Sequence, residues 1–180
     1  PRKEGGKLVP QGTQPNYQFL AKDNHWKVNL TKNFISLSTN HYTRWEDFAK
    51  RLDKVLAAFI RLYQPTYFER VGLRFINSIS RRALELEGAQ WRELLQPGFL
   101  GLLAERDMKE QGVMGEGQRY DLPLAGGCRA KIQSAPAMMQ RKDLRTQQEQ
   151  QEAVFILDLD IYMSGQVEAP HAAAALQTAH

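Results

Sequence analysis

The sequence lacks several features that would point to a particular class of protein. It has one cysteine, Cys128, among 180 residues, which excludes an internal disulfide and a zinc site built on several cysteines. Its longest apolar run, 55–60, is far too short to span a bilayer. The chain opens without a charged and apolar signal segment. We therefore expect a cytoplasmic protein that does not contact the membrane.

Motifs with a defined chemistry are also missing. The glycines at 115–117 and 126–127 lack the Lys-Ser/Thr pair and the strand-to-helix setting of a phosphate-binding loop. The Gly-x-Ser-x-Gly turn of serine hydrolases does not occur. The four histidines are scattered and show no metal-binding spacing; they are His25, His41, His171 and His180. The sequence thus predicts no cofactor, no metal and no catalytic residue.

The composition is that of a globular protein with an uneven distribution of charge. Hydrophobic residues make up 42% and charged residues 24%, which is close to the average for folded domains. Residues 1–82 carry 15 Lys and Arg against 6 Asp and Glu, whereas residues 83–180 carry 9 against 14. A basic half can indicate an anionic partner. Alternatively, the two halves neutralise each other across a shared sheet.

The first half of the chain contains the clearest secondary-structure signals. Short alternating runs at 17–20, 26–31 and 34–39, separated by polar turns, predict an antiparallel meander. Thr43 and Glu46 have the spacing of a capping box, and apolar residues then recur at helical intervals until Pro65. These signals predict a helix over 44–63.

The second half predicts further strands around a short helical insert. We expect a long strand over 66–79, short helices within 84–104 and a hairpin at 118–124 and 128–134. The polar, Gln-rich stretch near 136–152 is typical of a mobile loop. A strand over 153–163 and a helix from Pro170 complete the predicted order.

Together these elements predict an α+β fold with a mainly antiparallel sheet, in the order β-β-β-α-β, short helical insert, β-β-β-α. We expect an irregular lead-in over 1–15 and a single domain over 16–180, truncated at both ends. The two principal helices would pack on the sheet face that carries Trp26, Leu73 and Leu157.

The opposite face of this sheet is also partly apolar. Val154, Ile156 and Tyr162 share it, so we expect something to cover it: the lead-in, the short helices or a second subunit.

The main candidate site combines charges from two predicted strands. Arg70 and Arg74 flank Gly72 on one face of the first strand, and Asp158 and Asp160 share a face of the second. If the strands are neighbours, the arginines and aspartates can pair in a bidentate manner and fix the strand register. The alternative is a pocket for an anion or a polar ligand beside the bare glycine backbone. Its predicted ligand-binding residues are Arg70, Gly72, Arg74, Asp158, Asp160 and Tyr162.

Two further interpretations use the same charges. Asp158 and Asp160 are oxygen ligands of the kind that a divalent metal or an acid–base enzyme uses, but no third ligand lies close in sequence. Nucleic-acid binding would use short basic clusters and aromatic residues. These are Lys50, Arg51, Lys54, Arg81, Arg82, Arg141, Lys142 and Arg145, with Tyr17, Trp26 and Tyr42.

Several segments in fixed order resemble one protein family. They are 17–19, 33–37, 42–48, the Arg-x-Gly-Leu-Arg-Phe-Ile-Asn strand over 70–77 and the Leu-Asp-x-Asp strand that begins at Leu157. The chain resembles, over 16–80 and 153–180, a sporadically distributed family of uncharacterised prokaryotic proteins. The resemblance implies that Arg70, Gly72, Arg74, Asn77, Asp158 and Asp160 belong to a shared pattern. It implies no activity, cofactor or catalytic residue.

The sequence therefore favours a non-catalytic binding protein that acts on a protein partner or on a second copy of itself. The alternative is a small-anion or nucleic-acid binding protein that uses Arg70, Arg74 and the basic first half. The third hypothesis is an enzyme that uses Asp158 and Asp160.

Overall fold

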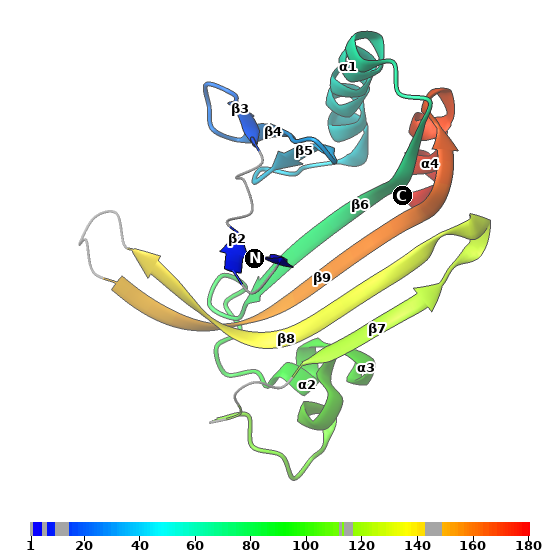
Figure 1. Cartoon of the computed structure of the whole chain (residues 1–180). Coiled ribbons are helices and arrows are strands. Elements are labelled where there is room, and N and C mark those ends of the chain that lie inside the picture. Colours follow the sequence, from blue (N-terminus) through cyan, green and yellow to red (C-terminus); the bar gives the residue numbers. More distant parts are fainter. Residues whose placement is uncertain (1, 5–6, 10–14, 112, 114–116, 143–148) are drawn as a thin grey trace. The chain divides into compact units, whose positions relative to one another are not determined.

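The structure, a computed structural model, has the α+β fold that the sequence predicts (Figure 1). It describes all residues except 1, 5–6, 10–14, 112, 114–116 and 143–148. The chain divides into two compact units, residues 1–65 and residues 66–180. The boundary at Pro65 lies inside the stretch 16–180 that the sequence indicated as a single domain.

The first unit holds two small antiparallel sheets and one long helix. Strands β1 (Arg2–Glu4) and β2 (Lys7–Val9) pair with each other, where the sequence predicted an irregular lead-in. Strands β3 (Tyr17–Leu20), β4 (Trp26–Leu30) and β5 (Ile35–Thr39) form the predicted meander, in the order β3-β4-β5. Helix α1 (Trp45–Tyr63) follows.

One face of this meander is apolar from edge to edge. Phe19 lies opposite Val28, and Val28 lies opposite Leu37, so all three side chains point to the same side. Trp26 shares that face and its ring lies 5.9 Å from the ring of Phe48, between ring centroids. Helix α1 therefore packs on the apolar face of the three-stranded sheet.

The predicted capping box at the start of α1 is wrong. The N-cap residue is Arg44, and no side chain caps the helix. Thr43 thus lies one residue too early for its hydroxyl group to reach the first free amides. Instead, Arg44 Nε donates a hydrogen bond of 2.8 Å to Asp47 Oδ2, and this ion pair ties the first turn together.

The second unit is built on a four-stranded antiparallel sheet in the order β6-β9-β8-β7 (Figure 1). Its strands are β6 (Tyr67–Ser80), β7 (Gln118–Pro123), β8 (Arg129–Lys142) and β9 (Glu149–Glu168). Most of the predicted loop near 136–152 is strand, because Met138 pairs with Ala153 and Gln140 pairs with Gln151 in a long hairpin. Residues 143–148 of that prediction lie outside the described residues.

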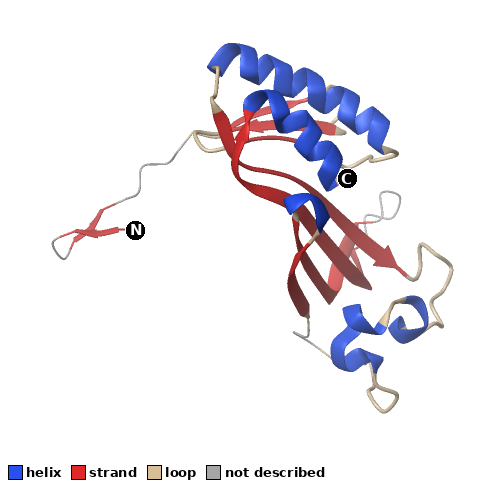
Figure 2. Ribbon diagram, turned by 90° about the vertical axis from the view of Figure 1, so that its right-hand side faces the viewer, coloured by secondary structure: helices blue, strands red, loops and turns tan. Residues whose placement is uncertain are grey.

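A helical insert covers one end of this sheet (Figure 2). It comprises α2 (Trp91–Leu94), α3 (Pro97–Leu100) and the 3-10 turn η1 (Gly101–Ala104). Trp91, Leu100 and Leu103 are buried around Phe155 of β9 and form the hydrophobic core of this end. Helix α4 (Ala172–Ala179) follows the 3-10 turn η3 (Ala169–His171) and contacts β6 and β9.

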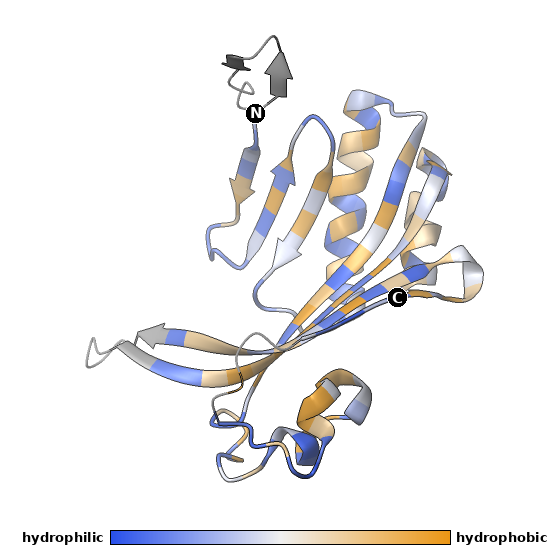
Figure 3. Ribbon diagram, turned by 60° about the horizontal axis from the view of Figure 1, so that its bottom comes forward, coloured by the Kyte–Doolittle hydropathy of each residue, from blue (hydrophilic) through white to orange (hydrophobic). Residues whose placement is uncertain are grey.

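The arrangement differs from the single sheet with two helices on one face that the sequence predicted. The three-stranded and four-stranded sheets are separate, and α1 and α4 belong to different units. Both sheets still show the expected alternation of hydrophilic and hydrophobic residues along their strands (Figure 3).

Candidate functional site

The register of the four-stranded sheet collects charged side chains on one face. Gly72 lies opposite Tyr162, and Arg74 lies opposite Asp160, so the predicted site residues of β6 and β9 share this face. On β8, the second neighbour of β9, Arg129 lies opposite Tyr162 and Lys131 lies opposite Asp160. The face therefore carries charge across three neighbouring strands, with β9 in the centre.

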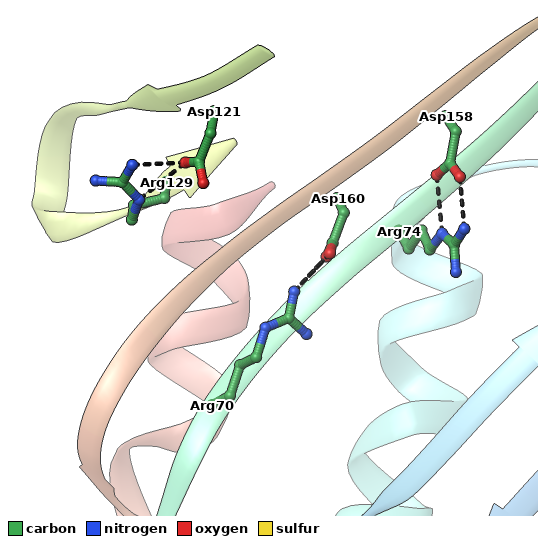
Figure 4. Close-up of polar contacts among 6 residues, drawn as sticks. All are labelled: Arg70, Arg74, Asp121, Arg129, Asp158 and Asp160. Atoms are coloured by element: carbon green, nitrogen blue, oxygen red, sulfur yellow. Dashed lines mark hydrogen bonds and ion pairs between the residues drawn. The ribbon is translucent and has the colours of Figure 1, made fainter. Parts of the chain in front are cut away.

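The two predicted arginines pair directly with the two predicted aspartates (Figure 4). Arg74 holds Asp158 through two parallel hydrogen bonds, of 2.8 Å from Nε and 2.5 Å from Nη2. Arg70 Nη2 lies 2.7 Å and 2.6 Å from the two carboxylate oxygens of Asp160. These contacts link the middle of β6 to the middle of β9 and fix their register.

The Arg74 pair shifts both of its members toward their charged forms. The hydrogen bonds from Arg74 lower the pKa of Asp158, although partial burial works in the opposite direction. The same contact raises the pKa of Arg74. A general acid needs a carboxyl group whose pKa is raised, so this pairing holds Asp158 in the form that cannot act as a general acid.

The space beside Gly72 is filled by the neighbouring strand. A Cβ atom added to Gly72 would lie 2.7 Å from Tyr162 Cβ and 2.8 Å from the carbonyl oxygen of Ile161. Glycine is therefore required because β6 and β9 approach each other closely at this point. The bare backbone of Gly72 faces Tyr162 of β9.

The charged residues themselves cover the apolar part of this face. The guanidinium carbon of Arg70 lies 4.2 Å from the ring centroid of Tyr162, and Lys131 Nζ lies 5.4 Å from it. These contacts cover Tyr162, which is only 6% exposed. Covering Tyr162 thus needs neither the lead-in nor a second subunit.

The sequence reasoning missed several members of this face. Arg129 pairs with Asp121 of β7 at 2.6 Å (Figure 4). Lys131 contacts Tyr162. Their signal is the period-two spacing of exposed residues within the hairpin of β7 and β8. Asn77, which the resemblance includes in the shared pattern, is exposed.

Other charged candidates are also engaged. Arg81 pairs with Glu110 at 2.9 Å, and its guanidinium carbon lies 4.2 Å from the ring centroid of Trp91. It therefore supports the helical insert. In the part of the chain that the structure describes, no group of three His, Cys, Asp or Glu side chains is placed to hold a metal ion. Arg145 and the side chains of Arg141 and Lys142 lie outside that part.

A second polar site lies within the first unit, where the sequence suggested only scattered residues. A groove of about 730 Å³ runs beside α1 and is lined by Trp26, Lys50, Arg51 and Lys54. The fold brings His25 and His41 to this groove, with ring centroids 5.0 Å apart. Their separation of sixteen residues gave no sign of this contact in the sequence.

Comparisons with protein-family models, curated proteins and solved structures find no match to this chain. The resemblance carried by the strand over 70–77 therefore stays a prediction. Across the described residues, no helix is long and apolar enough to cross a membrane.

Proposed function

We propose that this chain is a non-catalytic binding protein that associates with a second copy of itself through the free edge of β3. The observation that carries the proposal is the exposure of this strand. All four of its residues are exposed, including Tyr17 and Phe19 at 58% each and Leu20 at 62%. An edge strand with large apolar side chains is a template for pairing with another chain.

The rest of the first unit supports this proposal. From residue 15 to residue 65, no residue is buried, so the apolar face of β3, β4 and β5 is only partly covered by α1. A folded unit gains most of its stability from burying apolar surface. A second copy that extends the sheet would cover Tyr17 and Phe19, which α1 leaves exposed.

Strands β3 and β7, each at an edge of its sheet, differ in how they are protected. Strand β7, at the edge of the four-stranded sheet, carries Arg119, Asp121 and Pro123. Charged residues and proline on an edge strand discourage pairing with other chains. Strand β3 has no charged residue and no proline. Of these two edges, the β3 edge is therefore the better candidate for an interface.

A symmetric pairing of two β3 strands is geometrically simple. A two-fold axis perpendicular to the sheet at Gln18 would place Tyr17 of one copy opposite Phe19 of the other, on the same face. Cross-strand aromatic pairs of this kind stabilise a sheet by about 0.2–1 kcal/mol each. The two meanders would then form one continuous antiparallel sheet.

This proposal assigns no ligand to Arg70 or Arg74, because their ion pairs with the aspartates already use these side chains. It retains a cytoplasmic location and membership of the prokaryotic family that the sequence resembles. The buried free thiol of Cys128 is compatible with a reducing compartment.

Sedimentation equilibrium of the 180-residue chain tests the proposal. We expect the wild-type protein to dimerise and the double variant Tyr17→Lys/Phe19→Lys to be monomeric, because two like charges would meet across the new strand pair. The matched control is Leu62→Lys, which places a lysine at an exposed leucine of α1 away from the β3 edge. The control should dimerise like the wild type. A monomeric wild-type protein, or a double variant that dimerises equally well, would overturn the proposal.

A further inference from the structure

The basic side chains of the groove beside α1 differ in their ion pairing from the other cations described above. Lys50, Arg51 and Lys54 line it on successive turns of the helix. Among the described residues, none of the three lies within ion-pair distance of a carboxylate. Arg70 and Arg74 are paired, by contrast. The helix thus brings together three positive charges that have no direct ion pair among the described residues, although like charges three or four residues apart destabilise a helix.

The carboxylates that line the groove offset this charge only in part. Asp47 is bound by Arg44, whose hydrogen bond lowers the pKa of Asp47, and the charges of Lys50 and Arg51 act on Asp47 in the same direction. Asp23 accepts a hydrogen bond of 2.9 Å from the backbone amide of His25. Residues 1–65 as a whole contain 11 Lys and Arg against 5 Asp and Glu, so the surroundings of the groove are also basic.

Arg51 is held in an orientation suited to binding an anion. Its guanidinium carbon lies 4.5 Å from the ring centroid of Trp26, and Phe48 packs against the same tryptophan. Stacking on an aromatic ring uses the flat face of a guanidinium group and leaves the N–H groups at its rim available. These N–H groups match the geometry of phosphate oxygens and can bind two of them at once.

Two histidines also line this groove. His25 Nδ1 lies 3.0 Å from Asn40 Oδ1, which orients this ring. His41 lies beside it, with 5.0 Å between the ring centroids. The groove of about 730 Å³ is thus lined by two imidazoles, two lysines and one arginine together with two aspartates, and its size suits a nucleotide-sized anion.

We propose that the groove lined by Trp26, Lys50, Arg51 and Lys54 binds the phosphate group of a phosphate ester, with Arg51 as the bidentate contact. This inference goes beyond the self-association proposed above and does not depend on it. The ester is either a free nucleotide or a phosphodiester of single-stranded nucleic acid, since both present the same oxygens.

Titration calorimetry with defined probes tests this proposal. The probes are adenosine 5′-monophosphate, a ten-nucleotide oligothymidylate and adenosine, which lacks the phosphate group. We expect at least one of the two phosphate-bearing probes to bind and adenosine not to bind. Binding of the mononucleotide identifies a free ester as the ligand, and binding of the oligonucleotide alone identifies a phosphodiester chain. If neither phosphate-bearing probe binds, or if adenosine binds as well as the mononucleotide, the proposal is wrong.

Two matched variants distinguish binding at this groove from a general electrostatic attraction of the phosphate to the basic helix. Arg51→Gln should weaken binding by about tenfold or more, because it removes charge-assisted hydrogen bonds to the phosphate. Arg61→Gln removes the same charge from the same helix, outside the groove, and should leave the dissociation constant within about twofold. Lys54→Gln leaves the stack of Arg51 on Trp26 in place and should also weaken binding. Equal effects of Arg51→Gln and Arg61→Gln would overturn the proposal.

Discussion

The close approach of β6 and β9 at Gly72 makes a quantitative prediction for the variant Gly72→Ala. The added methyl group would lie 2.7 Å from Tyr162 Cβ, whereas carbon atoms normally pack about 3.5–4.0 Å apart. It would also lie 2.8 Å from a backbone oxygen of Ile161, which cannot rotate away as a side chain can. Strands β6 and β9 must therefore separate locally by roughly 1 Å.

The cost of this separation can be estimated from known overpacking effects. Forcing an extra methyl group into a packed site costs typically about 1–3 kcal/mol. Alanine also lowers the conformational entropy of the unfolded chain relative to glycine, and this stabilises the variant by about 0.4–1 kcal/mol. We expect a net loss of about 1–2 kcal/mol in the free energy of unfolding, and a melting temperature lower by roughly 2–8 °C.

Thermal and urea unfolding of Gly72→Ala and Gly98→Ala measure this effect. Gly98 lies in α3 and has no atom within 4 Å of the position that a Cβ would occupy, so its variant should be neutral or slightly stabilised. Equal stability of the two variants would refute the reasoning. It would mean that β6 and β9 are further apart at Gly72, with room there for a ligand.

Three further predictions concern stability. Asp158→Asn should cost about 1 kcal/mol at neutral pH, and a double-mutant cycle with Arg74 should show coupling between the two. Because Arg74 lowers the pKa of Asp158, this contribution should persist above about pH 4 and disappear as the pH falls through the pKa of the folded state; urea unfolding between pH 2 and 7 measures it. Trp91→Ala should cost about 3–5 kcal/mol in urea unfolding, since it empties the core around Phe155. Thr43→Ala should change the unfolding free energy by less than about 0.5 kcal/mol, and a loss near 1 kcal/mol would indicate that this hydroxyl caps α1 after all.

The sequence predicted those parts of the fold in which local pattern and long-range pairing agree. Alternation along 66–79 and 153–163 placed the arginines and aspartates on one face each, and the strands proved to be neighbours. To choose between ion pairs and a pocket, one must know the distance between β6 and β9 at Gly72. This distance depends on two segments about ninety residues apart in the chain.

Other parts depend on tertiary contacts that leave little trace in the sequence. The polar stretch near 136–152 resembles a loop because its strands are held by backbone pairing across a hairpin rather than by apolar residues. Lys50, Arg51 and Lys54 resemble an ordinary solvated helix face. Their special position follows only from the packing of α1 on Trp26, which also brings the histidine pair to the groove.

The most direct test of self-association through β3 is amide hydrogen exchange of residues 17–20 at several protein concentrations. Along an edge strand, alternate amides point away from the paired strand, here β4, and these amides of β3 have no strand partner among the described residues. We predict that these outward amides are protected from exchange at high protein concentration and lose this protection on dilution. In the double variant Tyr17→Lys/Phe19→Lys, the same amides should be unprotected at every concentration. Exchange at the rate of an unstructured peptide at every concentration would contradict the account.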